Sequence, residues 1–134
     1  GFVGFPGVGY YNATKFAVRG FTESLRQELE LMNAPVSATC VHPGGIKTNI
    51  ARDARYSTSL SSLSDRDAAD SRKAFEKAFI TSANEAARTI LKAVRRNQRR
   101  VLVGLDAYAI DLLVRLAPAG SQRLMMAMAR RMSK

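Results

Sequence analysis

The chain contains only two short apolar segments that are typical of buried strands, at residues 36–42 (VSATCVH) and 100–104 (RVLVG). Each follows a segment with helical periodicity, so strands and helices alternate. This alternation predicts an α/β fold with a parallel sheet and helical crossovers. Parallel sheets are covered on both faces and usually contain more than two strands. We therefore expect the sheet to include further strands that precede residue 1.

The helices are indicated by apolar residues at three- and four-residue spacing and by their end signals. A long helix is expected from about residue 10 to residue 32, and its apolar stripe is Ala13, Phe16, Ala17, Phe21, Leu25 and Leu29. A capping box at 82–85 (SANE) predicts a helix from Ala83 to about Arg96, with Ala86, Ile90 and Val94 facing inward. Further helices are expected over 67–79, 107–116 and 121–132, with the last two separated at Pro118 and Gly120.

The composition is that of a globular protein, and its cysteine content indicates the cellular compartment. The chain has 134 residues, 46% hydrophobic and 24% charged, which suits one partial domain over 1–134. It shows no signal peptide and no run of about twenty apolar residues that would predict a transmembrane helix. The single cysteine, Cys40, excludes an internal disulfide and fits a reducing compartment, so we expect a cytoplasmic protein. Cys40 itself is expected to be a small core residue of the first strand.

Positive charge is concentrated in the second part of the chain. Residues 1–82 hold ten Lys/Arg and eight Asp/Glu, whereas residues 83–134 hold eleven and three. The segment 105–134 is therefore expected to be a basic helical tail. In its last helix Leu124, Met125, Met128 and Met132 fall largely on one face, and Arg123 and Arg130 on another. This helix either touches an anionic membrane or covers a pocket or subunit contact; nucleic-acid binding is not expected, because no aromatic residues are interleaved with the charges.

The stretch GYYNATK, residues 9–15, places two tyrosines before a lysine. On a helix, residues four apart lie within roughly 40° of each other, and residues five apart are separated by roughly 140°. Only Tyr11 should therefore share a face with Lys15. The pair alone also fits an amphipathic core tyrosine beside an ordinary solvated lysine.

The surroundings of the pair add a family resemblance. The segments PGVGYYNATKFAVRGFTESLRQEL and VSATCVHPGGIKT closely resemble the short-chain dehydrogenase/reductase family, and ANEAARTILKAVRRNQRRVLVG looks like its last crossover helix and edge strand. The resemblance implies the C-terminal part of a Rossmann-like doubly wound parallel sheet with flanking helices. It implies an NAD- or NADP-dependent oxidoreductase that interconverts a carbonyl and an alcohol by hydride transfer. By resemblance, Tyr11 donates or accepts the proton, and Lys15 lowers the Tyr11 pKa and hydrogen-bonds the nicotinamide ribose.

The loop 43–48 (PGGIKT) follows the first strand, where open α/β sheets bind their ligands. By resemblance, Pro43 and Gly44 shape the turn against the nicotinamide, and the Ile46 backbone and the Thr48 hydroxyl contact the carboxamide. Gly45 and Lys47 occupy variable positions and receive no role. His42 is expected to mark the strand end rather than to act as a base. With one histidine and one cysteine, no metal site is expected.

Two features of the family are absent from the sequence. GFVGFPGVG, residues 1–9, is not the family's glycine-rich pyrophosphate loop, because no strand precedes it. The first serine, Ser24, lies on the long helix itself and cannot be the catalytic serine. We therefore expect the chain to be the C-terminal portion of an enzyme and to be inactive in isolation. The choice between NAD and NADP stays open.

The remaining expectations concern substrate and partners. The polar segment 51–72 occupies the position of the family's substrate loop, and the methionine-bearing tail suggests a hydrophobic ketone or alcohol. Members of the family usually form homo-oligomers. The alternative to an enzyme is a non-enzymatic truncated relative that binds anionic surfaces, including a membrane surface, through its basic C-terminal helices.

Overall fold

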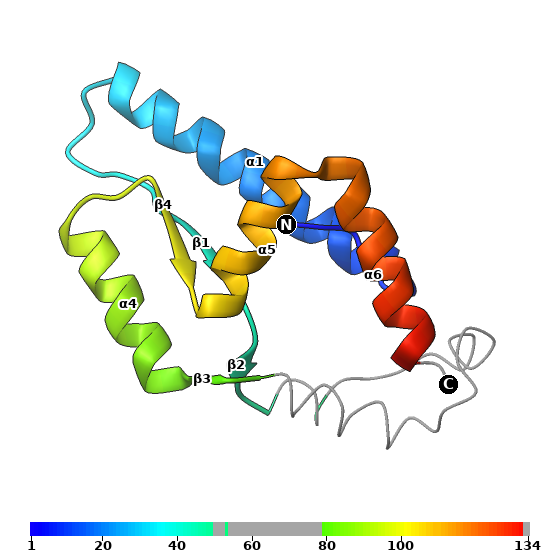
Figure 1. The fold of residues 1–134 in the computed structure, drawn as a ribbon. Helices are drawn as coiled ribbons and strands as arrows, with labels where there is room; N and C mark the ends of the chain where they lie inside the picture. Colours follow the sequence, from blue (N-terminus) through cyan, green and yellow to red (C-terminus); the bar gives the residue numbers. More distant parts are fainter. Residues whose placement is uncertain (50–52, 54–78, 133–134) are drawn as a thin grey trace.

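The elements of the computed structural model follow the expected alternation of helices and strands (Figure 1). The structure describes residues 1–49, 53 and 79–132. In chain order the elements are α1 (Gly9–Leu31), β1 (Cys40–Pro43), β2 (Ile46–Lys47), β3 (Thr81–Ser82), α4 (Ala83–Arg95), β4 (Arg100–Val103), α5 (Leu105–Leu116) and α6 (Pro118–Met132).

The two expected strands pair with each other in parallel, as β1 and β4. Cys40 is aligned with Arg100, and Pro43 with Val103. The first strand is shorter than the expected 36–42, because its partner β4 begins only after a turn in which Asn97 has a positive φ of 51°. Residues 36–39 therefore have no strand opposite them. A second parallel pair, β2 with β3, lies beyond the end of β1 and was not expected from the sequence.

Helix α4 covers one side of the strand pair with small apolar side chains. Ser82 and Glu85 form the expected capping box at its start. Ala86, Ala93, Val101 and Val103 form the buried cluster, with Val41, Ile46 and Ile90 packed against it. Val94, which was expected to face inward, is exposed, because Ala93 rather than Val94 points at the strands.

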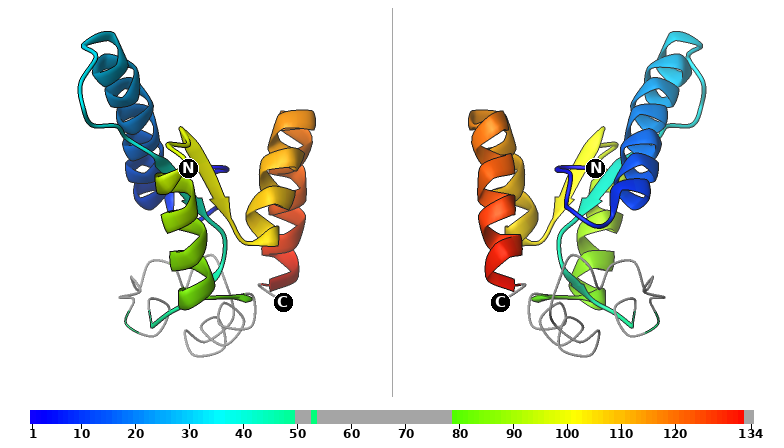
Figure 2. Two further views of the ribbon diagram at one scale, coloured as in Figure 1. Left: turned by 90° about the vertical axis from the view of Figure 1, so that its left-hand side faces the viewer. Right: turned by 90° about the vertical axis from the view of Figure 1, so that its right-hand side faces the viewer.

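Helix α1 and the pair α5–α6 flank the strands away from α4, and α5 packs against both α6 and β4 (Figure 2). The buried residue of α1 is an arginine, Arg26, and not a member of the expected apolar stripe. Phe21 is 70% exposed, and Ala13, Phe16 and Ala17 are also exposed. These four residues of the apolar stripe are therefore exposed in the described part of the chain.

The last two helices meet at Ala117, where the chain leaves the helical conformation before Pro118. Proline suits the first position of a helix, so α6 starts there and includes Gly120, which was expected to be a break. Within α6, Met125 is buried, but Leu124 and Met128 are nearly half exposed. Because α6 packs on α5 along one narrow line, the expected methionine face is split. Contact between the tail and an anionic surface remains a prediction.

Several expectations fall outside the described residues. Of the segment 51–72 only Asp53 is described, and of the expected helix over 67–79 only Phe79, which is not helical. The substrate-loop assignment therefore stays a prediction. None of the helices in the described ranges is both long and apolar enough to cross a membrane.

Candidate active site

Tyr11 and Lys15 lie in the first two turns of α1 and face each other. The Lys15 Nζ atom is 5.2 Å from the centroid of the Tyr11 ring. Tyr11 is 55% exposed, whereas the neighbouring Tyr10 is 94% exposed. The face shared by Tyr11 and Lys15 is the one that the four-residue spacing predicts. The pair is thus open to a ligand, and what it does remains a prediction.

The first turn of α1 is held by the segment that precedes it. The Asn12 side-chain amide donates to the carbonyl of Phe5 at 3.0 Å, and the Asn12 N–H donates to the carbonyl of Val8 at 2.9 Å. Gly7 has a positive φ of 81°, which allows the chain to turn into the helix. No side chain caps the helix at Val8. The N–H groups next to Tyr11 are therefore oriented by main-chain contacts.

The strand-end segment 43–48 is fixed by bonds to the strands β4 and β3. The Gly44 N–H donates to the Val103 carbonyl of β4 at 2.9 Å. The Thr81 N–H donates to the Gly45 carbonyl at 3.2 Å, and Ile46 and Lys47 pair with Thr81 and Ser82. The expectation of a plain loop was therefore wrong at Ile46 and Lys47, because a strand from a distant part of the chain is available to pair with them.

The pairing of β2 with β3 does not use the backbone N–H and C=O of Ile46. In a parallel pair of strands, a residue whose N–H and C=O face the other strand bonds to the two residues on either side of its aligned partner, and not to that partner itself. Thr81 accordingly bonds Gly45, and the N–H and C=O of Ile46 point away from β3. One donor and one acceptor on a single residue match the needs of a planar amide, such as a carboxamide.

Asp106, in the first turn of α5, is a residue that the sequence analysis missed. Its Oδ2 atom accepts the Gly45 N–H at 2.5 Å, across 61 residues of sequence. The signal that could have found it is local: an acidic residue in the first turn of a helix that directly follows a strand and a glycine. The residue that it contacts, however, is set only by the parallel pairing of β1 with β4.

His42 is buried on the strand surface and does not face solvent as a base would. Its ring centroid is 5.0 Å from that of Phe2, and its Nε2 has no hydrogen-bond partner among the described residues. Burial, reinforced by the nearby Arg100 guanidinium, lowers the pKa of His42 to about 4. A neutral, buried ring fits the expectation that His42 marks the strand end.

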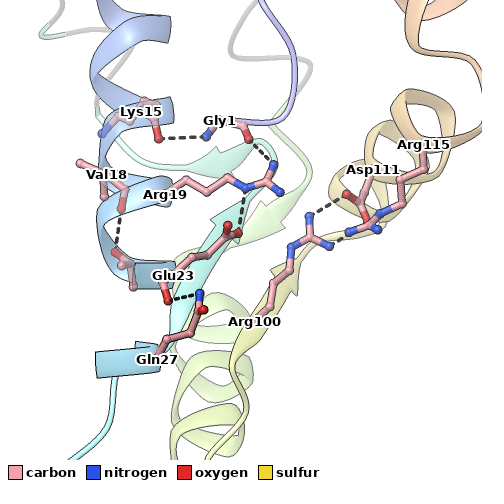
Figure 3. A network of polar contacts seen from close by, with 10 residues as sticks. Gly1, Lys15, Val18, Arg19, Glu23, Gln27, Arg100, Asp111 and Arg115 are labelled. Carbon is pink, nitrogen blue, oxygen red and sulfur yellow. Dashed lines mark hydrogen bonds and ion pairs between the residues drawn. The ribbon is translucent and has the colours of Figure 1, made fainter. Parts of the chain in front are cut away.

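A charged network surrounds this face of the strands (Figure 3). The Arg100 guanidinium donates two hydrogen bonds to Asp111, at 2.9 and 2.6 Å, and Arg115 donates a third at 2.9 Å. The hydrogen bond from Arg100 holds the pKa of Asp111 well below its usual range. On α1, Arg19 is paired with Glu23 at 2.9 Å. The network supports the strands and carries no group that is aimed at the strand-end segment.

The residues expected to bind a cofactor thus come from two elements. Pro43, Gly44, Ile46 and Thr48 lie together at the carboxyl end of β1, and Tyr11 and Lys15 lie on α1, which packs against β1. Exposed phenol, ammonium and main-chain amide groups are chemically suited to hydroxyls and a carboxamide. Within residues 1–49, 53 and 79–132, no group of three or more His, Cys, Asp or Glu residues could hold a metal ion.

Parallel strands, helical crossovers and a glycine turn at the strand ends define an α/β protein of the class that binds ligands beyond the carboxyl edge of its sheet. Residues 1–58 match the family model described as short chain dehydrogenase. The Mycobacterium tuberculosis oxidoreductase SadH is 46% identical over 127 residues, which is 95% of this chain and 44% of SadH. The chain belongs to the short-chain dehydrogenase/reductase family and has its Rossmann-like α/β fold.

Other relatives agree with this assignment. The Bacillus subtilis oxidoreductase YxnA is 37% identical over 115 residues, which is 86% of this chain and 29% of YxnA. The Homo sapiens dehydrogenase/reductase SDR family member 11 is 48% identical over 42 residues, 31% of this chain and 16% of that protein. The chain thus spans less than half of the length of these relatives. No solved structure matches it significantly.

Proposed function

We propose that this chain forms part of an NAD- or NADP-dependent oxidoreductase that interconverts a carbonyl and an alcohol, with Tyr11 as general acid and base. The observation that carries the proposal is the Tyr11–Lys15 pair, in which an ammonium lies 5.2 Å from an exposed phenol ring within the segment that matches the family model. The names of the relatives SadH and YxnA support an oxidoreductase in general terms.

The chemistry asked of the pair is proton transfer. The nicotinamide cofactor supplies or accepts the hydride at the substrate carbon. The Tyr11 hydroxyl gives its proton to the alkoxide oxygen during reduction and recovers one from the alcohol during oxidation. The Lys15 ammonium stabilises the phenolate that remains on Tyr11, because opposite charges at this separation attract.

The strand-end segment is proposed to hold the nicotinamide end of the cofactor. Pro43 and Gly44 form the turn against the ring, and the Ile46 main chain and the Thr48 hydroxyl bind the carboxamide. The support is geometric: the backbone of Ile46 points away from β3, and its neighbours are bonded to β3 and β4. Neither the glycine-rich pyrophosphate loop nor the catalytic serine of the family lies in this sequence, so we expect the isolated 134-residue chain to be inactive.

The test is Tyr11→Phe in the complete protein that carries this chain. We expect turnover to fall by about 10² to 10⁴, the range of general acid–base catalysis, with little loss of stability because the hydroxyl is exposed. Tyr10→Phe is the matched control, since Tyr10 is adjacent and more exposed, and it should leave turnover unchanged. Full activity in Tyr11→Phe, or equal losses in both variants, would contradict the proposed role of Tyr11.

A further inference from the structure

Asp106 is in the first turn of α5. This helix starts where the carboxyl ends of β1 and β4 lie (Figure 1). The Asp106 Oδ2 accepts the Gly45 N–H at 2.5 Å. Its Oδ1 is buried and has no hydrogen-bond partner among the described residues. A hydrogen bond to a charged acceptor is about twice as strong as a neutral one, and a carboxylate is further stabilised in the first turn of a helix. Asp106 thus binds one peptide group of the strand-end segment, the one that carries the Gly45 N–H.

Two glycines make room for this carboxylate. A Cβ atom at Gly44 would collide with the Asp106 carboxyl group. A Cβ atom at Gly104 would lie 2.5 Å from Asp106 Oδ1 and 2.7 Å from Thr81 Oγ1, both far shorter than an ordinary van der Waals contact. The two positions differ in their backbone: Gly104 has a positive φ of 96°, which disfavours any side chain, whereas at Gly44 the three atoms nearest to an added Cβ all belong to Asp106.

We propose that Asp106 is a positioning residue that fixes the Gly44–Gly45 peptide, limits rotation at the Gly45 Cα and thereby aims the Ile46 backbone at the nicotinamide carboxamide. The aim toward the cofactor rests on the proposed function. Asp106 holds the Gly44–Gly45 peptide through the Gly45 N–H, and Thr81 holds the next peptide, which carries the Ile46 N–H, through the Gly45 carbonyl. The two peptides are joined at the Cα of a glycine, so the direction of the Ile46 N–H depends on both restraints. Without the carboxylate, one of these two restraints is lost.

The first measurement is amide hydrogen exchange at Gly45 in the complete protein without cofactor. Asp106→Ala should speed exchange at Gly45 at least about tenfold, because the bond that protects this N–H is lost. Asp106→Asn keeps an acceptor oxygen and should retain most of the protection. Unchanged exchange at Gly45 in Asp106→Ala overturns the proposal.

The second measurement separates positioning from a structural role. Asp106→Ala should raise the KM and Kd for the dinucleotide about tenfold with a smaller change in kcat, while Asp106→Asn stays close to the native values. Faster exchange at Gly45 with an unaltered dinucleotide Kd would show that the Asp106–Gly45 hydrogen bond is structural only, and would overturn the positioning role. If Tyr11→Phe is fully active, the proposed function fails. The exchange rate at Gly45 still decides whether the Asp106–Gly45 hydrogen bond exists.

The single variant Gly44→Ala covers the case in which Asp106→Ala does not fold. Gly44→Ala displaces the carboxylate in an otherwise native chain and should give the same faster exchange and weaker dinucleotide binding. Where Asp106→Ala folds, adding Gly44→Ala should lower the Tm less than Gly44→Ala does alone. Gly104→Ala should lower the Tm in both backgrounds, because its backbone strain does not depend on Asp106. Native behaviour of Gly44→Ala contradicts the proposal.

Discussion

The two sides of the β1–β4 pair are built in opposite ways. On the side of α4, small apolar residues such as Ala93 and Val103 fill the space. On the other side, His42 and Arg100 lie under Phe2, and Arg100 is joined to α5 through Asp111. Strand side chains alternate between the two faces, so neighbouring residues of β4 belong to different environments.

The difference shows where this structure depends on charge. The α4 side is stabilised by burial of apolar surface, which involves no titrating group and so does not change with protonation. The other side is stabilised by directed bonds among a few charged groups, and their contribution changes with protonation. Each of the following measurements tests whether the two sides differ in this way.

The largest effect is expected at Arg26, the buried arginine of α1. Its guanidinium donates to Glu30 at 2.6 Å, to the Ala38 carbonyl at 3.1 Å and to the Asn97 side chain at 2.7 Å. Arg26→Met keeps the aliphatic packing but removes the donor to the Ala38 carbonyl and the Asn97 side chain, while Glu30 keeps Arg99 as a partner, so the free energy of unfolding should fall by about 3 kcal/mol. Denaturant titration measures this change in the free energy of unfolding.

Arg19→Met is the control for Arg26. Arg19 forms a partly exposed ion pair with Glu23 on the same helix and donates to the Gly1 carbonyl at 3.3 Å, and such surface pairs contribute less than about 1 kcal/mol. Equal losses in the two variants would mean that the contacts of Arg26 with Asn97 and Ala38 add nothing to stability.

The next effect contrasts the two sides directly. Asp111→Asn removes the charge that Arg100 and Arg115 share, and should cost about 1 to 2 kcal/mol at pH 7. Because the pKa of Asp111 is lowered in the folded state, its contribution is present above the ordinary pKa of 3.8 and is lost as pH falls below it. The cost of Asp111→Asn should therefore shrink at acid pH.

Val103→Ala is the matched control on the α4 side. It should cost about 2 kcal/mol by leaving a small cavity, and that cost should be the same at pH 7 and at acid pH. Unfolding midpoints of both variants across the same pH series make the comparison. A cost for Val103→Ala that follows pH as that of Asp111→Asn does would remove the contrast between the sides.

The smallest effect is the acid sensitivity of His42. Burial lowers its pKa from 6.5 to about 4, so between these values the unfolded state binds a proton that the folded state does not. Stability should therefore decline by about 1 to 2 kcal/mol as pH falls through that window. Arg100 and Arg19 oppose protonation of the ring, and Glu23 favours it. His42→Leu should flatten the decline, and an unchanged slope in that variant would assign the acid sensitivity to other groups.

Much of the fold could be predicted because its signals are local. The capping box at Ser82, the strand at Arg100 and the proline before α6 each depend on residues a few positions apart. The exposure of Phe21 and the error at Val94 have one cause: a periodic pattern identifies an apolar face but does not say which neighbour covers it.

The candidate site also contains features that follow from local sequence and features that do not. The shared face of Tyr11 and Lys15 follows from helical spacing alone and was predictable. The contacts of Gly45 with Asp106 and of Arg26 with Asn97 span 61 and 71 residues, and no local pattern specifies them.

The sequence by itself therefore determined the order of helices and strands, the family and the Tyr11–Lys15 pair, since each is encoded by residues close together in the chain. Only the tertiary structure decided that β2 pairs with β3, that Asp106 bonds Gly45 and that an arginine is the buried residue of α1. The physical reason is that a hydrogen bond depends on the positions of two atoms in space. Those positions were fixed when β1 and β4 paired.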